Sequence, residues 1–387
     1  MNSNSGPLNG LLVVELAEAL AGPYASMILG DLGAEVIKIE RSDIGDQSRS
    51  WGPPFINNES AYFLGTNRNK KSITIDLKNT HELRRLHKLL KQSDVFITNL
   101  HKVDRQEKFD ISFRQLSEKN HKLIYAAISG YGFTGYSSEL PGYDILAQAS
   151  SGLMTITGED HTKVVRFPTP MADISAGVYT VISILSALIY RTNSGKGQFI
   201  DVSLSDSQLT WLANIGSSYL NANYEPKPLG NIHPTITPYQ PFMTKDKYII
   251  IATGTQKLWQ ELCNAINSPE LIQDIRFIDN VSRNNNRMEL VEIIEVKLSS
   301  KNAIEWLELL NKKEIPCGPI NTVPEALADK HAISRNMIIE LEHPMTGLIK
   351  NIGSPINLSL SPVSYRLPPP LLGEHTQEII ETFDLDK

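Results

Sequence analysis

Asp173 is the residue of this sequence best suited to covalent chemistry. It lies in the octapeptide 170–177, between a proline-containing loop and a long apolar run. Its neighbours in the octapeptide are mostly small, so a bulky substrate has room to approach. A carboxylate that attacks a thioester must be ionised and shielded from water. A helix start beside a proline-rich loop can provide both conditions, which makes Asp173 a candidate nucleophile.

The apolar run 178–190 predicts a buried helix that starts near Asp173. Val178, Ile182, Leu185 and Ile189 recur at helical spacing. At the start of this helix, Asp173 is expected to be an N-cap, whose carboxylate accepts hydrogen bonds from the free N–H groups of the first turn. The helix dipole is expected to hold this carboxylate ionised. Capping is the usual role of such an aspartate, so the octapeptide by itself favours capping over catalysis.

Length and composition describe an ordinary globular protein. The chain has 387 residues, 41% hydrophobic residues and a net charge of −6, which favours two domains and disfavours nucleic acid as a partner. The polar start, 1–7, is expected to be disordered and lacks the features of a secretory signal. We expect no membrane-spanning stretch, because the apolar run after Asp173 is interrupted. Cys263 and Cys317 form no metal or disulfide motif, so no metal site and a reducing cytoplasm are expected.

Alternating elements in the first half predict a doubly wound parallel sheet. Strand candidates at 11–16 and 35–40 flank a helix that begins near Pro23 and ends near Gly33. Helical segments then alternate with strands at 94–98 and 123–129. The proline-rich stretch 224–244 indicates a linker or crossover, and a smaller unit with one strand and several helices follows.

Two glycine-containing segments fail the usual nucleotide-binding patterns. A dinucleotide fingerprint requires Gly-x-Gly-x-x-Gly after the first strand, whereas this chain has Ala21-Gly22-Pro23 there. Gly195-Lys196-Gly197-Gln198 lacks the spacing of a P-loop. The sequence therefore argues against an NAD enzyme and against a P-loop nucleotidase.

Motifs along nearly the whole chain, in one order, are similar to those of the family III CoA-transferases. This CaiB/BaiF group includes the formyl-CoA:oxalate and carnitine CoA-transferases and, as an offshoot, the α-methylacyl-CoA racemases. Each motif is weak alone, but the ordered set is specific. The matching segments are Ala21-Gly22-Pro23, Leu32–Glu40, Gly45-Asp46 with Arg49, Asn67–Ser72, Ser129–Gly132, Gly142-Tyr143-Asp144, Met171-Ala172-Asp173, Gly195–Gln198 with Ile200–Leu204, and Pro370–His375.

The resemblance implies an α/β fold and a reaction. The large CoA-binding domain starts with residues 1–205 and is completed by a return segment, 326–387, while 206–224 is a linker helix and 225–325 a small α+β domain. Relatives form interlocked homodimers. Asp173 matches the family nucleophile, which attacks an acyl-CoA to give an aspartyl anhydride and then an aspartyl-CoA thioester. The CoA thioester is a substrate, and no permanently bound cofactor is implied.

Tyr143 distinguishes two activities within this resemblance. Racemases of the family have a histidine here that moves a proton beside the thioester carbonyl. A tyrosine has an ordinary pKa of about 10 and is a poor base near neutral pH. Tyr143 and the neighbouring Asp144 match residues that line the family's active site. The chain is therefore expected to be a transferase, with an acyl-CoA racemase or epimerase as the alternative and a catalytically silent acyl-CoA-binding protein as a third possibility.

The resemblance also assigns residues to CoA and to a mobile loop. The positions matching CoA contacts are Ala19, Leu20, Ala21, Arg41, Ile75, Lys78, Asn99 and Leu100. The loop after Asn99 departs from the family's Arg-Pro-Gly pattern, so its phosphate contact falls to Arg105 or Lys108. Gly254, Thr255 and Gln256 match a loop that can close over the active site. This loop has one glycine where the oxalate enzyme has several, which favours another acid such as succinate.

Overall fold

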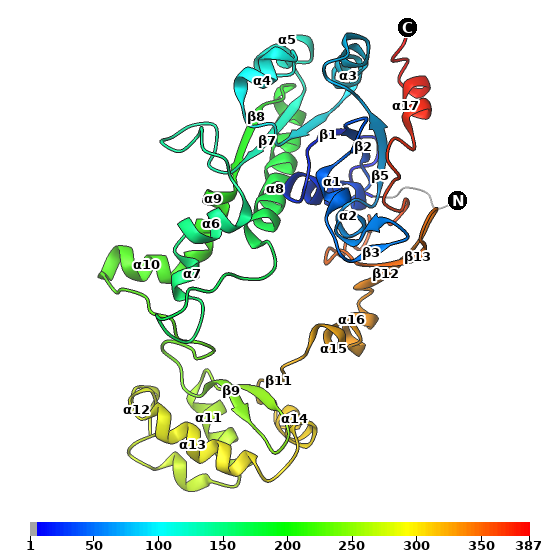
Figure 1. The fold of residues 1–387 in the computed structure, drawn as a ribbon. Coiled ribbons are helices and arrows are strands. Elements are labelled where there is room, and N and C mark those ends of the chain that lie inside the picture. The colour runs from blue at the N-terminus through cyan, green and yellow to red at the C-terminus, as the bar shows by residue number, and fades with distance from the viewer. Residues whose placement is uncertain (1–5) are drawn as a thin grey trace. The chain divides into compact units, whose positions relative to one another are not determined.

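The computed structural model describes residues 6–387, which divide into two compact units (Figure 1). The first unit comprises the chain up to Leu153, Arg166–Asn223 and Lys330–Lys387. The second comprises Met154–Val165 and Tyr224–Asp329. Most of the polar start that was expected to be disordered lies outside the described residues. The chain therefore leaves the first unit twice and returns to it twice.

A six-stranded, entirely parallel sheet forms the centre of the first unit, in the order β5-β2-β1-β6-β7-β8. The chain adds β2 and β5 on one side of β1 and the later strands on the other, so the strand order reverses between β1 and β6. This arrangement confirms the predicted α/β parallel sheet. The strands are β1 (Leu12–Leu16), β2 (Glu35–Glu40), β5 (Lys70–Thr74), β6 (Val95–Thr98), β7 (Ile124–Ser129) and β8 (Phe199–Ser203).

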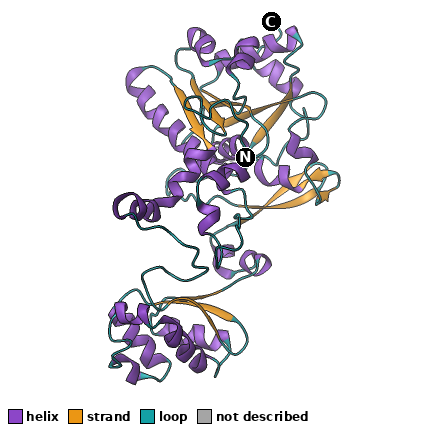
Figure 2. Cartoon of the chain, turned by 60° about the vertical axis from the view of Figure 1, so that its left-hand side comes forward, coloured by secondary structure: helices purple, strands orange, loops and turns teal. Residues whose placement is uncertain are grey.

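Helices connect these strands and cover both faces of the sheet (Figure 2). A short hairpin, β3 (Phe55–Ile56) with β4 (Glu59–Ser60), precedes α2. The helices up to residue 223 are α1 (Ala21–Asp31), α2 (Ala61–Thr66), α3 (Thr80–Gln92), α4 (Val103–Lys108), α5 (Phe113–Lys119), α6 (Asp144–Ser150), α7 (Leu153–Ile156), which extends into the second unit, α8 (Met171–Ser194), α9 (Leu204–Leu209) and α10 (Ala213–Ala222).

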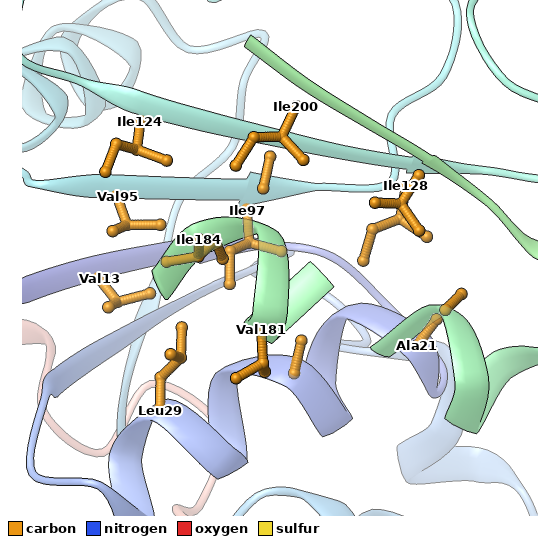
Figure 3. Packing of buried hydrophobic residues seen from close by; sticks show 14 of the residues in the cluster. Val13, Ala21, Leu29, Val95, Ile97, Ile124, Ile128, Val181, Ile184 and Ile200 are labelled. Atoms are coloured by element: carbon orange, nitrogen blue, oxygen red, sulfur yellow. The ribbon is translucent and has the colours of Figure 1, made fainter. Parts of the chain in front are cut away.

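Each face of the sheet has its own apolar core, as expected for parallel strands that are buried on both sides. On one face, Val13, Ile97 and Ile124 pack against Leu29 of α1 and Ile184 of α8 (Figure 3). On the other, alternate strand residues pack against α3, α5 and the C-terminal helix. Members of this second core include Val14, Ile37, Phe96, Tyr125, Leu86, Leu89, Leu116 and Ile379.

The C-terminal segment packs on the first unit in three places. Helix α16 (Lys330–Ser334) leads to the antiparallel hairpin β12 (Ile338–His343) and β13 (Gly347–Ile352), which shares a small core with α2. Arg366 donates to the carbonyl oxygens of Gly30 (2.8 Å) and Ala34 (2.9 Å). Helix α17 (Thr376–Thr382) completes the second core. Residues more than 300 positions apart in sequence thus stabilise one domain.

The second unit has its own sheet and its own core. Its three antiparallel strands, in the order β11-β10-β9, pack against helices around the buried Trp259 and Trp306. The apolar residues of α11 and α14 recur at helical spacing, which is the amphipathic pattern expected of surface helices. The elements are β9 (Tyr239–Met243), β10 (Tyr248–Ala252), β11 (Cys317–Pro319), α11 (Gln256–Ala265), α12 (Asn280–Asn285), α13 (Arg287–Leu298), α14 (Ala303–Lys312) and α15 (Val323–Leu327).

Helix α8 exists as predicted, but its buried face was wrongly assigned. Small residues such as Ala176 and Thr180, with Val181 and Ile184, face the sheet because they allow α8 to pack closely on it. Three of the four residues expected to be buried are exposed instead: Val178 (39%), Ile182 (52%) and Ile189 (69%). The helical spacing of the apolar residues therefore predicted the helix but not which of its sides packs against the sheet.

Helix α8 also corrects the expectation about membrane spans. Its length of 24 residues and its mean hydropathy of 1.7 over 18 residues make it long and apolar enough to cross a membrane. That window is 44% buried inside the structure. The core helix of a soluble protein meets the same two criteria, so this finding is weak evidence for a membrane span.

Candidate active site

A cavity of about 420 Å³ opens at the carboxyl ends of β1, β6 and β7. This is the point where the strand order of the sheet reverses, and open α/β sheets bind ligands there. All lining residues belong to the first unit. They are Glu18, Ala19, Leu20, Ala21, Gln47, Trp51, Tyr62, Asn99, His101, Arg105, Ile128, Ser129, Gly130, Pro141, Gly142, Tyr143, Asp144, Asp173 and Leu204.

Asp173 lines this cavity from the first turn of α8, but it is not the N-cap that the sequence suggested. The N-cap position is Pro170, which makes no side-chain capping bond. Asp144 takes over that function from the start of α6: its Oδ1 accepts the N–H of Ala172 (2.8 Å) and the N–H of Asp173 (3.4 Å). The Asp173 carboxylate is therefore free of the capping role.

The pKa of the Asp173 carboxyl group is raised, contrary to the expectation that the helix dipole would hold the group ionised. Burial, followed by the nearby charge of Asp144, raises the pKa of Asp173 to about 7. No hydrogen-bond donor contacts its carboxylate among residues 6–387. A carboxylate that is partly removed from water and has no hydrogen-bond donor is a stronger nucleophile than a hydrated one, and the pKa of Asp173 lies near the pH at which most enzymes work.

Gln148 positions the carboxylate of Asp144 from one turn along α6. Its Nε2 donates to Asp144 Oδ2 (2.6 Å) and its Oε1 accepts the N–H of Phe167 (2.9 Å). One buried amide therefore joins the loop before α8, helix α6 and the start of α8. Sequence reasoning missed Gln148, although the Asp144–Gln148 spacing of four residues on a helix predicts such a pair.

Tyr143 lies at the N-cap position of α6 and is 64% exposed. Its side chain lines the rim of the cavity together with Asp144 and Asp173, as the resemblance implied. The structure thus brings the three candidate catalytic residues to one site.

Two aromatic residues that sequence reasoning overlooked form another wall of the cavity. Trp51 and Tyr62 pack edge to face, with ring centroids 5.0 Å apart. Burial, then the charges of Asp173 and Asp144, raise the pKa of Tyr62 to about 12. Its phenol therefore stays protonated and can act as a hydrogen-bond donor. The only sequence signal was their position shortly after the Gly45-Asp46 motif.

The loop between β1 and α1 forms the wall predicted to contact CoA. Ala19, Leu20 and Ala21 line the cavity. Asn99, at the end of β6, fixes the backbone of this loop at Glu18 with two hydrogen bonds. Its Nδ2 donates to the Glu18 carbonyl (2.9 Å), and its Oδ1 accepts the Glu18 N–H (3.3 Å).

The remaining predicted CoA residues separate into a second cavity and two other positions. Arg41, Ile75 and Lys78 line a cavity of about 460 Å³. Arg41 of this cavity pairs with Glu18 of the first (3.0 Å), so the two cavities adjoin. Arg105 lines the first cavity. Leu100 and Lys108 line neither cavity: Leu100 packs on the second core, and Lys108 lies over the Phe109 ring.

Gly254, Thr255 and Gln256 lie in the second unit and do not line the cavity of the first. Thr255 caps α11 by accepting the N–H of Leu258 (3.2 Å). Gln256 donates to the Ile278 carbonyl (2.8 Å) and accepts from Arg283 (2.9 Å). Within the second unit these residues thus organise the start of α11.

Over residues 6–387 the structure has no group of three or more His, Cys, Asp or Glu side chains arranged to hold a metal ion.

Comparison with known proteins identifies the class. The model of CoA-transferase family III matches residues 8–376, so the chain belongs to this family and is a CoA-transferase. Of the motifs that suggested the family, Ala21, Ser129-Gly130, Gly142-Tyr143-Asp144 and Asp173 contribute residues to the lining of the first cavity.

Its relatives refine that class. The chain is similar to the succinyl-CoA:glutarate CoA-transferase of Mus musculus, with 40% identity over 97% of this chain and 86% of the relative. It is also similar to the succinate–glutarate CoA-transferase of Agrobacterium fabrum, with 37% identity over 98% and 96% of the two chains. A CaiB/BaiF family protein from Brucella suis has a similar solved structure, with a TM-score of 0.88, 38% identity and coverage of 98% and 100%.

Proposed function

We propose that this CoA-transferase moves CoA reversibly between succinyl-CoA and a small dicarboxylic acid of the glutarate class, with Asp173 as the nucleophile. The observation that carries the proposal is the Asp173 carboxylate: it faces a cavity, is largely buried, and has no hydrogen-bond donor among the described residues. The substrate class comes from the names of the similar proteins, which transfer CoA between succinate and glutarate.

The proposed chemistry conserves an activated acyl bond at each step. Asp173 attacks the succinyl-CoA carbonyl, which forms an aspartyl–succinyl anhydride and expels CoA thiolate. The thiolate attacks the aspartyl carbonyl, which forms aspartyl-CoA thioester and releases succinate. The acceptor carboxylate then attacks this thioester, which forms an aspartyl–acceptor anhydride and expels CoA thiolate. The thiolate attacks the acceptor carbonyl of this anhydride, which forms the acceptor acyl-CoA and releases the Asp173 carboxylate. Water must be excluded throughout, because it would hydrolyse either intermediate.

The two adjoining cavities suit the two ends of CoA. Arg41 and Lys78 supply positive charge in the outer cavity, where phosphates would be bound, although Asp43 and Asp76 line the same cavity. The pantetheine arm would then pass the Ala19–Ala21 loop and bring the thioester to Asp173. Arg105, which lines the inner cavity, is available to an anionic group of either substrate.

The interlocked homodimer belongs to the same proposal. Exposed apolar residues follow one side of α8, namely Val178, Ile182, Ile189 and Tyr190, and an exposed apolar stripe of this length favours contact with another chain. A second copy is the occupant that the family resemblance implies. We expect a dimer mass in solution.

The test is the intact mass of the protein after incubation with succinyl-CoA, with and without hydroxylamine, for wild type and Asp173→Ala. Wild type should give an aspartyl-CoA adduct and a hydroxamate, and the variant should give neither. Glutaryl-CoA should appear when glutarate is added. If no adduct forms but deuterium from D₂O enters the α-carbon of a branched acyl-CoA, the enzyme is a racemase and the transfer proposal is wrong.

A further inference from the structure

A cluster of buried charges lies directly beneath the loop that separates β1 from α1. Lys38 Nζ pairs with Glu15 (2.7 Å) and with Asp46 (2.8 Å), and Lys70 Nζ pairs with the other oxygen of Glu15 (2.9 Å). All four side chains are completely buried. Two positive and two negative charges balance, which is the condition under which buried ions are tolerated.

Three members of this buried-charge cluster bind the backbone of residues 17–23. Lys38 donates to the Ala17 carbonyl (2.9 Å), and Lys70 donates to the Pro23 carbonyl (2.8 Å). Between them, Asp46 Oδ1 accepts the N–H of Ala19 (3.1 Å). The charges are therefore arranged around one loop, and that loop lines the active-site cavity.

The contact with Asp46 falls on the one residue of this loop with an unusual backbone. Ala19 has a φ of +69°, in the left-handed region that residues with a Cβ rarely occupy. Asp46 is itself fixed, because the same Oδ1 accepts the backbone N–H (2.8 Å) and the hydroxyl (2.7 Å) of Ser48. A carboxylate that is held rigidly at this point compensates for the unfavourable conformation of Ala19.

We propose that Asp46 is a positioning residue for acyl-CoA: it holds Ala19 in the left-handed conformation and so sets the backbone of residues 19–21 against the pantetheine arm. Asp46 does not contact the reacting atoms in this proposal. It acts through Ala19, and its effect is on the affinity for CoA. The proposal rests on the proposed function only in that the cavity is taken to bind a CoA thioester.

The experiment measures CoA binding by isothermal titration calorimetry, so that it does not depend on turnover. Asp46→Ala should remain folded by circular dichroism and should bind CoA about tenfold more weakly, the loss expected for one hydrogen bond to a charged group. Asp46→Ala with Ala19→Gly should recover most of that loss, because glycine adopts a positive φ without strain. Steady-state kinetics should show the same change in the KM for acyl-CoA and little change in the KM for the acceptor acid.

Three outcomes separate the possibilities. If the folded Asp46→Ala variant binds CoA as tightly as wild type, or if Ala19→Gly restores nothing, the positioning role is wrong and the cluster serves stability alone. If wild type itself does not bind CoA, the proposed function fails instead. If Asp46→Ala does not fold, Ser48→Ala replaces it, because this variant keeps all the charges and removes one hydrogen bond to Asp46. Ser48→Ala should weaken CoA binding about threefold, and Ala19→Gly should reverse the loss. CoA binding by Ser48→Ala as tight as that of wild type would refute the proposal.

Discussion

Replacing Asp173 with asparagine tests the electrostatics of the site independently of catalysis. The substitution keeps the shape of the side chain and removes its ability to ionise. In the wild type, burial and the charge of Asp144 raise the pKa of Asp173 to about 7. The folded protein therefore carries a penalty whenever this carboxylate is ionised, and the asparagine variant does not.

The size of the penalty follows from the pKa. The rise from the ordinary value of 3.8 to about 7 is roughly three pKa units, and one unit corresponds to about 1.36 kcal/mol. This gives an upper value of about 4 kcal/mol, which partial exposure to solvent and salt reduces to about 1–2 kcal/mol. Because the pKa of Asp173 is raised in the folded protein, the stability that its protonated form provides is complete below about pH 4. This stability is lost as the pH rises through about 7.

The measurement is urea denaturation of wild type and Asp173→Asn at pH 5.0 and at pH 8.0. At pH 8.0 we expect the variant to be more stable than wild type by about 1–2 kcal/mol, and at pH 5.0 the difference should fall to about a third of that. The same variant should be inactive in CoA transfer. Stability gained by removing a functional group is typical of active sites that hold unfavourable charges.

The matched control is Asp104→Asn, which removes an exposed carboxylate that lines neither cavity. Its stability should differ from wild type by the same small amount at both pH values. If Asp173→Asn is destabilised at pH 8.0, or if its advantage is equal at both pH values, the carboxylate is not raised in pKa by burial, and the electrostatic account of the nucleophile is wrong.

Four further predictions follow from the site. The value of kcat/KM for succinyl-CoA should rise with pH to a plateau, with its midpoint near 7, as Asp173 ionises; a profile that is flat from pH 6 to 8 would contradict this. Gln148→Leu should lower kcat about tenfold, because Asp144 loses its 2.6 Å contact and the start of α8 loosens; an unchanged kcat would show that Gln148 is dispensable. Arg105→Gln should raise the KM for acyl-CoA about tenfold, while the exposed Arg114→Gln should not; a rise confined to the KM for glutarate would instead place Arg105 at the acceptor acid. Ile182→Glu should convert the expected dimer to monomer, as measured by light scattering, and a dimer that survives it would exclude this side of α8 as the contact.

Local patterns in the sequence predicted several elements of the large domain, although not β5 (Lys70–Thr74). The first βαβ unit could be predicted because apolar runs, Pro23 near the helix start and Gly33 after its end are short-range signals. The ordered motifs identified the family, and they pointed to Asp173 as the candidate nucleophile, without any knowledge of contacts.

The motifs themselves did not reveal their physical roles. Lys38, Asp46 and Lys70 appeared in the sequence only as parts of the matching segments, and the structure shows them as buried charges beneath one loop. Such a role depends on partners that no local pattern specifies, since Asp46 and Ala19 are 27 positions apart in the chain.

Tertiary structure alone decided the chemistry of Asp173 and the exposure of α8. The sequence pattern at the start of α8 is the same whether Asp173 or a distant residue caps the helix. Only folding brings Asp144, from another helix, to the Ala172 N–H. Burial by residues far apart in the chain then raises the pKa of the carboxyl group. Likewise, helical periodicity shows that Ile182 and Ile189 share one side of α8, but which side contacts the sheet is determined by the small residues that allow close packing. The sequence therefore determined the family and the candidate nucleophile, whereas packing determined the pKa of that candidate, its neighbours and the surface left exposed.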